Sequence, residues 1–111
     1  MNRFIMMGKY TPEALKGFIA NPDQNRRVAA EMMCDAIGLE LSDFFLTKGE
    51  SDFVAIGQGN SEQILAIKMA TMSSGTLNNI SILEEVDLRE PATLASKALE
   101  NYKTPTSLGA G

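Results

Sequence analysis

The stretch from Leu39 to Gly57, LELSDFFLTKGESDFVAIG, constrains the fold of this chain more than any other part of it. The pattern predicts two β-strands joined by a turn at residues 48–50. A strand with one solvent-exposed face alternates apolar and polar residues. Here apolar residues run without interruption from Phe44 to Leu46 and from Phe53 to Ile56. Both faces of these strands are therefore expected to be covered, one by helices and the other by a partner.

Length and composition limit the classes of protein to consider. The 111 residues are enough for one domain, and the net charge of −4 argues against nucleic acid as a partner. No apolar run approaches the ~20 residues of a membrane helix. The single cysteine excludes an internal disulfide and favours a reducing cytoplasm. Because histidine is absent, a metal site is not expected. Gly57-Gln58-Gly59 lacks the third glycine of a nucleotide-binding motif, so no other cofactor is expected either.

Apolar periodicity and turn residues divide the chain into alternating strands and helices. Strands are expected at Arg3–Tyr10, Leu39–Thr47, Asp52–Gly57 and Leu77–Val86. Helices are expected after Thr11-Pro12, from Asn21-Pro22 to Gly38, from Asn60 to about Met72, and from Pro91 to about Tyr102. In the last strand Ile80 and Ile82 should share one face, with Leu83 on the other.

The helix boundaries rest on capping residues. Thr11 is expected to cap the first helix, with Pro12 in its first turn. Asn21 is expected to cap the second helix with Pro22 at its first position, and Gly38 to end it with a left-handed residue. Asn60 with Gln63 has the spacing of a capping box. The run from Gly57 to Gly59 is expected to break the preceding strand.

The order β-α-β-β-α-β with a terminal helix predicts an α+β fold of ferredoxin-like type. Such a fold has a four-stranded antiparallel sheet with its helices on one face. The bare face would be apolar, so we expect a homodimer or higher homo-oligomer in which two sheets pack face to face about a two-fold axis. Residues 1–103 are expected to form this single domain, and residues 104–111 a flexible tail.

Three segments resemble one known family. They are Tyr10-Thr11, the run from Phe45 to Ile56, and Ser74-Gly75, and together they are similar to GYD-domain proteins over about residues 3–87. That family is named for a Gly-x-Tyr-Asp turn, which Gly49 and Asp52 match and which Ser51 departs from, since tyrosine usually stands there. The resemblance implies the dimeric α/β-barrel fold. Relatives in the wider superfamily include small oxygenases, degradative enzymes and proteins that only bind or assemble.

Asp52 is the first candidate for chemistry because it begins a buried-type strand and matches that motif. Burial would make its carboxylate a base. The structural alternative is an acceptor for backbone N–H groups around Gly49, and turn carboxylates usually have that role. We favour the structural role by roughly two to one.

Lys68 falls between Ile64 and Met72 on the apolar side of its helix, where a cation is costly unless paired. It is interpreted either as a reactive amine or as a side chain whose stem packs while the ammonium reaches water, and the second is favoured. By position, Tyr10 and Lys48 are expected near the strand ends at the mouth of a site. Together with Asp52 and Lys68 they form the predicted ligand-binding set, and no catalytic residue is assigned.

Cys34 lies opposite the apolar face of its helix on a helical wheel, so it is expected to face solvent or a neighbouring subunit. The chain also has seven methionines, four of them in Met6-Met7 and Met32-Met33. Methionine suits adaptable packing around an apolar ligand, although it is more often ordinary core.

Two classes of function remain open. The first is an oligomeric module that assembles through its sheet face or holds a small apolar molecule. The second is a cofactor-independent enzyme that acts on a small apolar carbonyl or aromatic substrate. A pocket containing Asp52 or Lys68 would favour the enzyme. The absence of histidine and the Ser51 departure favour the module.

Overall fold

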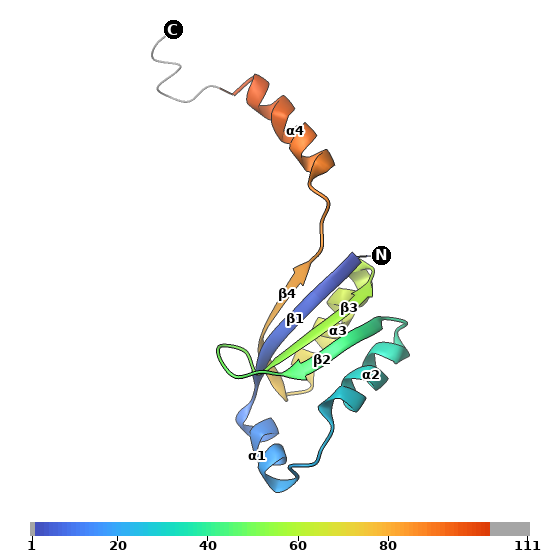
Figure 1. Ribbon diagram of the computed structural model, residues 1–111, viewed down its shortest axis with the longest axis vertical. Helices are drawn as coiled ribbons and strands as arrows, with labels where there is room; N and C mark the ends of the chain where they lie inside the picture. Colours follow the sequence, from blue (N-terminus) through green and yellow to red (C-terminus); the bar gives the residue numbers. More distant parts are fainter. Residues whose placement is uncertain (1, 103–111) are drawn as a thin grey trace.

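A computed structural model of the chain describes residues 2–102. Its elements follow the predicted order, with two helices in the first connection (Figure 1). They are β1 (Asn2–Tyr10), α1 (Pro12–Ala20), α2 (Arg26–Ala36), β2 (Glu40–Leu46), β3 (Phe53–Gly59), α3 (Ser61–Ser73), β4 (Leu77–Glu84) and α4 (Arg89–Glu100). The four strands form one antiparallel sheet in the order β2-β3-β1-β4. The protein is therefore an α+β protein with the ferredoxin-like arrangement, as predicted.

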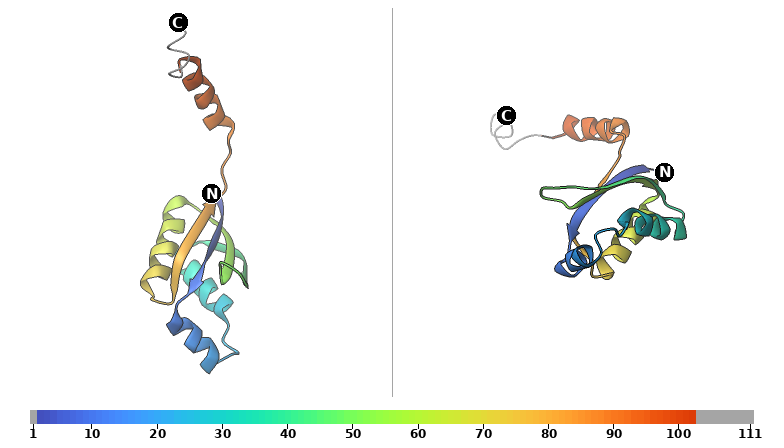
Figure 2. Two further views of the ribbon diagram at one scale, coloured as in Figure 1. Left: turned by 90° about the vertical axis from the view of Figure 1, so that its left-hand side faces the viewer. Right: turned by 60° about the horizontal axis from the view of Figure 1, so that its bottom comes forward.

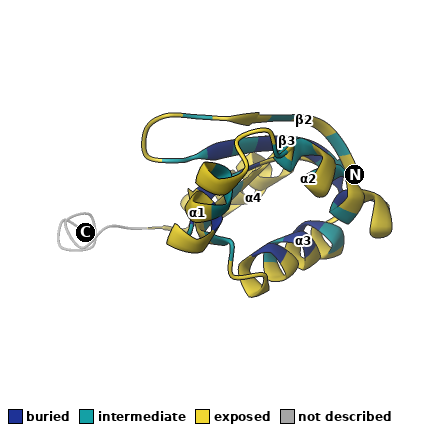
Figure 3. Ribbon diagram, turned by 90° about the horizontal axis from the view of Figure 1, so that it is seen from below, coloured by how far each residue is buried: buried dark blue, intermediate teal, exposed yellow. Residues whose placement is uncertain are grey.

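One face of the sheet forms the floor of the hydrophobic core. Alternate residues of β1 and β3 point to this face, where Phe4 and Phe53 are almost completely buried. Ile64 and Ile67 of α3 and Cys34 of α2 close the core from above. Figure 3 shows the buried positions gathered on the strands and on the inner side of α3.

The opposite face carries two apolar rows that cross the strands. Phe45, Val54 and Met7 stand side by side on β2, β3 and β1, and Ile56, Ile5 and Leu83 do so on β3, β1 and β4. We call these six residues the open sheet face. Leu83 remains 56% exposed and Phe45 44% exposed. The two-sided apolar character predicted for the strands is thus present.

Two of the three predicted helix caps are confirmed. The Thr11 hydroxyl accepts the Ala14 N–H, and Asn60 and Gln63 form the complete capping box of α3. The prediction for α2 was wrong. Asn21 ends α1, and α2 begins at Arg26, where the Asn25 side chain caps it by accepting the N–H groups of Arg27 and Val28.

The predicted break at Gly57 is also wrong, because β3 continues to Gly59 and pairs with Asn2 of β1. Gly57 has a packing role instead. A Cβ atom there would lie 2.4 Å from the Glu40 carbonyl oxygen and 2.9 Å from the Phe4 ring. Gly38 does end its helix as predicted, with φ at +74°.

Helix α4 stands apart from the sheet and gives the molecule its elongated shape of 70 × 28 × 22 Å (Figure 2). It begins at Arg89, two residues before the predicted Pro91, and all of its residues are exposed. Its apolar residues include Leu94 and Leu99, which are 66% and 67% exposed. An amphipathic helix without a packing partner among residues 2–102 is suited to contact another surface. The predicted tail at 104–111 lies outside the described residues.

Candidate functional site

A cavity of about 130 Å³ lies between the sheet and helices α2 and α3. Its floor comes from all four strands, and its walls come from the two helices and the start of β4. The lining residues are Phe4, Met6, Tyr10, Arg26, Ala29, Ala30, Met33, Cys34, Leu41, Phe44, Ala55, Ile67, Thr71, Ser74, Thr76 and Leu77. Most are apolar, and two of the methionines singled out in the sequence, Met6 and Met33, are among them.

Aromatic rings give one end of the cavity its shape. The Tyr10 ring meets the Phe18 ring edge to face at 5.1 Å and lies 5.7 Å from the Phe53 ring. Phe44 stacks on Phe53 at 5.9 Å. Such contacts fix ring positions more strictly than aliphatic packing does. Of these four rings, those of Tyr10 and Phe44 line the cavity, and those of Phe18 and Phe53 pack against them.

Arg26 brings a positive charge to this aromatic end. Its guanidinium carbon lies 4.9 Å from the centre of the Phe18 ring and 5.4 Å from that of Tyr10. Its Nε is the one buried side-chain nitrogen or oxygen that has no hydrogen-bond partner within residues 2–102. No carboxylate in that part of the chain lies within 4.0 Å of its nitrogens. A cation in this setting has unused hydrogen-bonding capacity.

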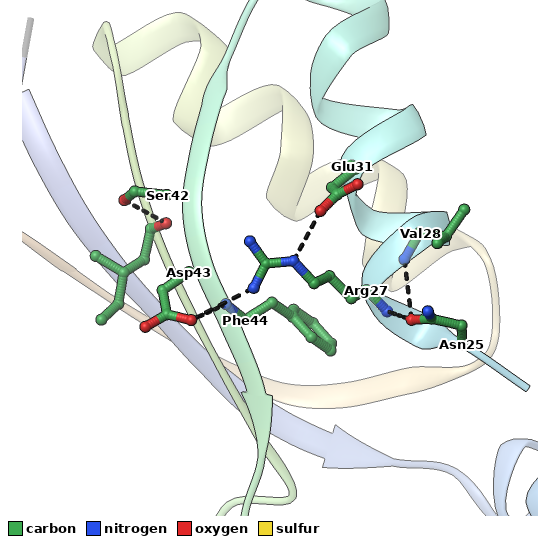
Figure 4. Close-up of polar contacts among 8 residues, drawn as sticks. Asn25, Arg27, Val28, Glu31, Ser42, Asp43 and Phe44 are labelled. Carbon is green, nitrogen blue, oxygen red and sulfur yellow. Dashed lines mark hydrogen bonds and ion pairs between the residues drawn. The ribbon is translucent and has the colours of Figure 1, made fainter.

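The adjacent Arg27 has a different environment. Its Nε donates to Glu31 Oε1 at 2.7 Å, and its Nη1 lies 3.4 Å from Asp43 Oδ1 on β2 (Figure 4). Hydrogen bonding to Glu31 raises the pKa of Arg27. Arg27 therefore links α2 to the edge strand, whereas Arg26 faces the cavity.

The sequence prediction missed Arg26 because it placed the first residue of α2 at Pro22. Residues 25–27 were therefore not recognised as the start of the helix. The signal available was Asn25, which is as good a cap as Asn21. A start at Asn25 places Arg26 in the first turn, next to the preceding helix.

Tyr10 and Asp52 are the two predicted site residues that the structure brings together. The Tyr10 backbone N–H donates to Asp52 Oδ2 at 2.9 Å, and the Asp52 N–H donates to the Gly8 carbonyl at 2.7 Å. Asp52 is thus an acceptor for a backbone N–H, but of β1 and not of the turn around Gly49. Burial is the main cause that raises the pKa of Tyr10, and the charge of Arg26 opposes it.

We expect Asp52→Asn to lower the free energy of unfolding by about 1–2 kcal/mol, because a neutral amide oxygen is a weaker acceptor for the Tyr10 N–H. Urea denaturation measures this loss. Glu50→Gln, in the same turn and exposed, is the control and should change little. Unchanged stability of Asp52→Asn combined with loss of ligand binding would contradict the structural role.

The prediction for Cys34 was wrong, because the residue is 4% exposed and lines the cavity. The prediction took Val28 and Met32 as the buried face of α2, but they are 47% and 69% exposed, and the side of the helix that carries Cys34 faces the cavity instead. Burial raises the pKa of the Cys34 thiol, with a smaller effect from Asp35. A thiol of this kind packs as a small apolar group and is a poor nucleophile.

The structure places the other two predicted residues away from the cavity. Lys48 is exposed in the turn between β2 and β3. Lys68 is half-buried on α3 and lines a shallow surface depression with Ile64, Leu65 and Ile82. This depression is separate from the lining of the cavity.

For Lys68→Met we expect a change in unfolding free energy of less than about 0.5 kcal/mol, because methionine keeps the packed stem and removes only the ammonium. Thermal unfolding at neutral pH is the measurement. A loss of roughly 3–5 kcal/mol would instead show that the ammonium is buried against a carboxylate.

Among residues 2–102, no group of three or more histidine, cysteine, aspartate or glutamate side chains is placed to hold a metal ion. None of the helices described is long and apolar enough to cross a membrane.

The sheet order, with α2 and α3 on one face of the sheet, defines a ferredoxin-like α+β domain with an apolar cavity between its layers. A comparison with protein-family models matches residues 4–95 to the GYD domain. The chain therefore belongs to the GYD-domain family, as the turn at Gly49 and Asp52 suggested. Comparison with curated proteins and with solved structures gave no match.

Proposed function

We propose that the protein is a homo-oligomeric module that binds a small apolar molecule. The observation that carries this proposal is the cavity between the sheet and helices α2 and α3. Its volume of about 130 Å³ is close to that of an engineered apolar cavity of ~150 Å³ that takes up benzene. The natural ligand would thus have an apolar body about the size of one ring.

The chemistry of the lining supports binding more than catalysis. The two lining residues with shifted pKa values, Tyr10 and Cys34, are both shifted upward, mainly by burial. Both therefore keep their protons at neutral pH and suit contact with a ligand better than proton abstraction. Asp52, the candidate base, holds the Tyr10 backbone.

Assembly through the open sheet face is the second part of the proposal. The centre of this face is apolar, and the Arg3–Glu85 ion pair lies at its rim beside Ile5 and Leu83. An apolar centre with a charged rim is the usual composition of a stable interface. A second copy offers the same two rows of side chains, so a two-fold axis would pair the faces and form a dimeric barrel.

Toluene is a suitable probe for the cavity. We expect it to raise the unfolding temperature and to shift the NMR methyl signals of lining residues such as Leu41, Ile67 and Leu77. Ala30→Leu, which adds atoms to the lining, should weaken toluene binding at least about tenfold, since one tenfold step needs only ~1.4 kcal/mol. Ala66→Leu on the exposed side of α3 is the matched control. Equal binding to both variants, or none to the wild type, would refute the proposal.

A further inference from the structure

The strongest unexplained feature of the cavity is the unused hydrogen-bonding capacity of Arg26. The buried Nε has no partner within residues 2–102. The rings of Tyr10 and Phe18 attract the charge of the guanidinium. An aromatic face is a weak hydrogen-bond acceptor, however, and does not replace an oxygen as partner for an N–H group. The arrangement holds the cation in place and leaves its donors available.

The serine and threonine hydroxyls at the cavity do not share this property. Thr71 Oγ1 is bonded to the Ile67 carbonyl at 2.8 Å, Ser74 Oγ to the Thr71 carbonyl at 2.6 Å, and Thr76 Oγ1 is paired with Ser74 Oγ at 2.8 Å. These hydroxyls already have partners in the protein. Arg26 is therefore the charged lining residue with a buried donor that a polar ligand atom would satisfy.

A guanidinium matches carboxylate and phosphate groups, because its N–H groups form a planar fork that binds two oxygens at once. Of the two, the carboxylate is smaller and carries less charge, which suits a mostly apolar cavity of about 130 Å³. The remaining lining is apolar and has room for a body of about one ring. The positive charge of Arg26 and an apolar volume are thus adjacent in one cavity. A ligand that uses both has one carboxylate and a compact apolar body.

We propose that the cavity selects small monocarboxylates with an aromatic or branched aliphatic body, and that Arg26 binds the carboxylate. This inference rests on the proposed function, since it names the ligand class of the same cavity. The rings of Tyr10 and Phe18 position the guanidinium, while Phe4, Met6 and Phe44 contact the apolar body.

Benzoate, benzyl alcohol and toluene test the inference, because they share one ring and differ in charge. At neutral pH and low salt we expect titration calorimetry and NMR to show at least tenfold tighter binding of benzoate than of the two neutral compounds. Arg26→Met should remove this preference and retain toluene binding, which also shows that the variant is folded. Arg27→Met, a neighbour with carboxylate partners of its own, should keep the preference.

The outcomes separate the inference from the proposed function. Equal binding of benzoate and toluene to the wild type would overturn the ligand class and leave the binding cavity standing. A preference for benzoate that survives in Arg26→Met would equally overturn the role of Arg26. Failure of all three compounds to bind would refute both proposals. The comparison on the wild type needs no variant, so the test holds even if Arg26→Met does not fold.

Discussion

Replacing Leu83 with glutamate is expected to dissociate the protein into monomers. Leu83 is 56% exposed in the single chain, so the substitution costs the isolated domain little. If two open sheet faces pack together, the glutamate is buried without a partner in the interface. An uncompensated buried charge costs roughly 3–5 kcal/mol, which corresponds to weakening of association by at least ~100-fold.

Leu65→Glu is the matched control, because Leu65 is also 56% exposed but lies on α3, away from the open sheet face. Sedimentation equilibrium across micromolar concentrations measures both variants and the wild type. We expect Leu65→Glu to keep the wild-type mass and Leu83→Glu to lose it. A wild-type chain that is a stable monomer of 12.0 kDa would contradict the predicted interface.

Gly57→Ala is expected to give a large loss of stability. The added Cβ would lie 2.4 Å from the Glu40 carbonyl oxygen and 2.9 Å from the Phe4 ring. The oxygen belongs to the backbone of β2 and Phe4 is almost completely buried, so neither can move away freely. We expect a cost of about 3 kcal/mol, since overpacking usually costs 1–3 kcal/mol and here backbone must shift as well.

Thermal unfolding should show this cost as a decrease of roughly 10–20 °C, since 1 kcal/mol corresponds to about 4–8 °C in a domain of this size. Gln58→Ala is the control, because the adjacent Gln58 is half-buried on the opposite face of the same strand. If Gly57→Ala unfolded at the wild-type temperature, the close approach of β2 and β3 at this point would be in error.

Much of the fold follows from local signals in the sequence. The capping box at Asn60 and Gln63 and the cap at Thr11 define helix starts through contacts within four residues, so a single sequence is enough to find them. The apolar runs that begin at Phe44 and Phe53 were enough to predict a sheet with two apolar faces. The four-stranded antiparallel sheet then followed from the order of elements along the chain.

The errors arose where distant parts of the chain decide between locally equal choices. Asn21 and Asn25 are equally good caps by residue type. In the structure Asn21 ends α1, and Asn25 caps the start of α2. In a sequence, a glycine inside a strand pattern suggests that the strand ends there. Gly57 is instead required because β2 and Phe4 approach its Cα closely. Cys34 is buried because β2 lies beneath the end of α2.

The sequence by itself determined the elements of this protein, their order and the two-sided apolar character of its sheet, because these depend on residues that are neighbours along the chain. Only the tertiary structure decided that Tyr10, Phe18 and Arg26 surround one end of a cavity, and that Lys68 does not reach it. A cavity is the space left between side chains from separate elements, and its shape depends on helix starts and strand register together. If α2 began one turn earlier or later, a residue other than Arg26 would line the cavity at this point.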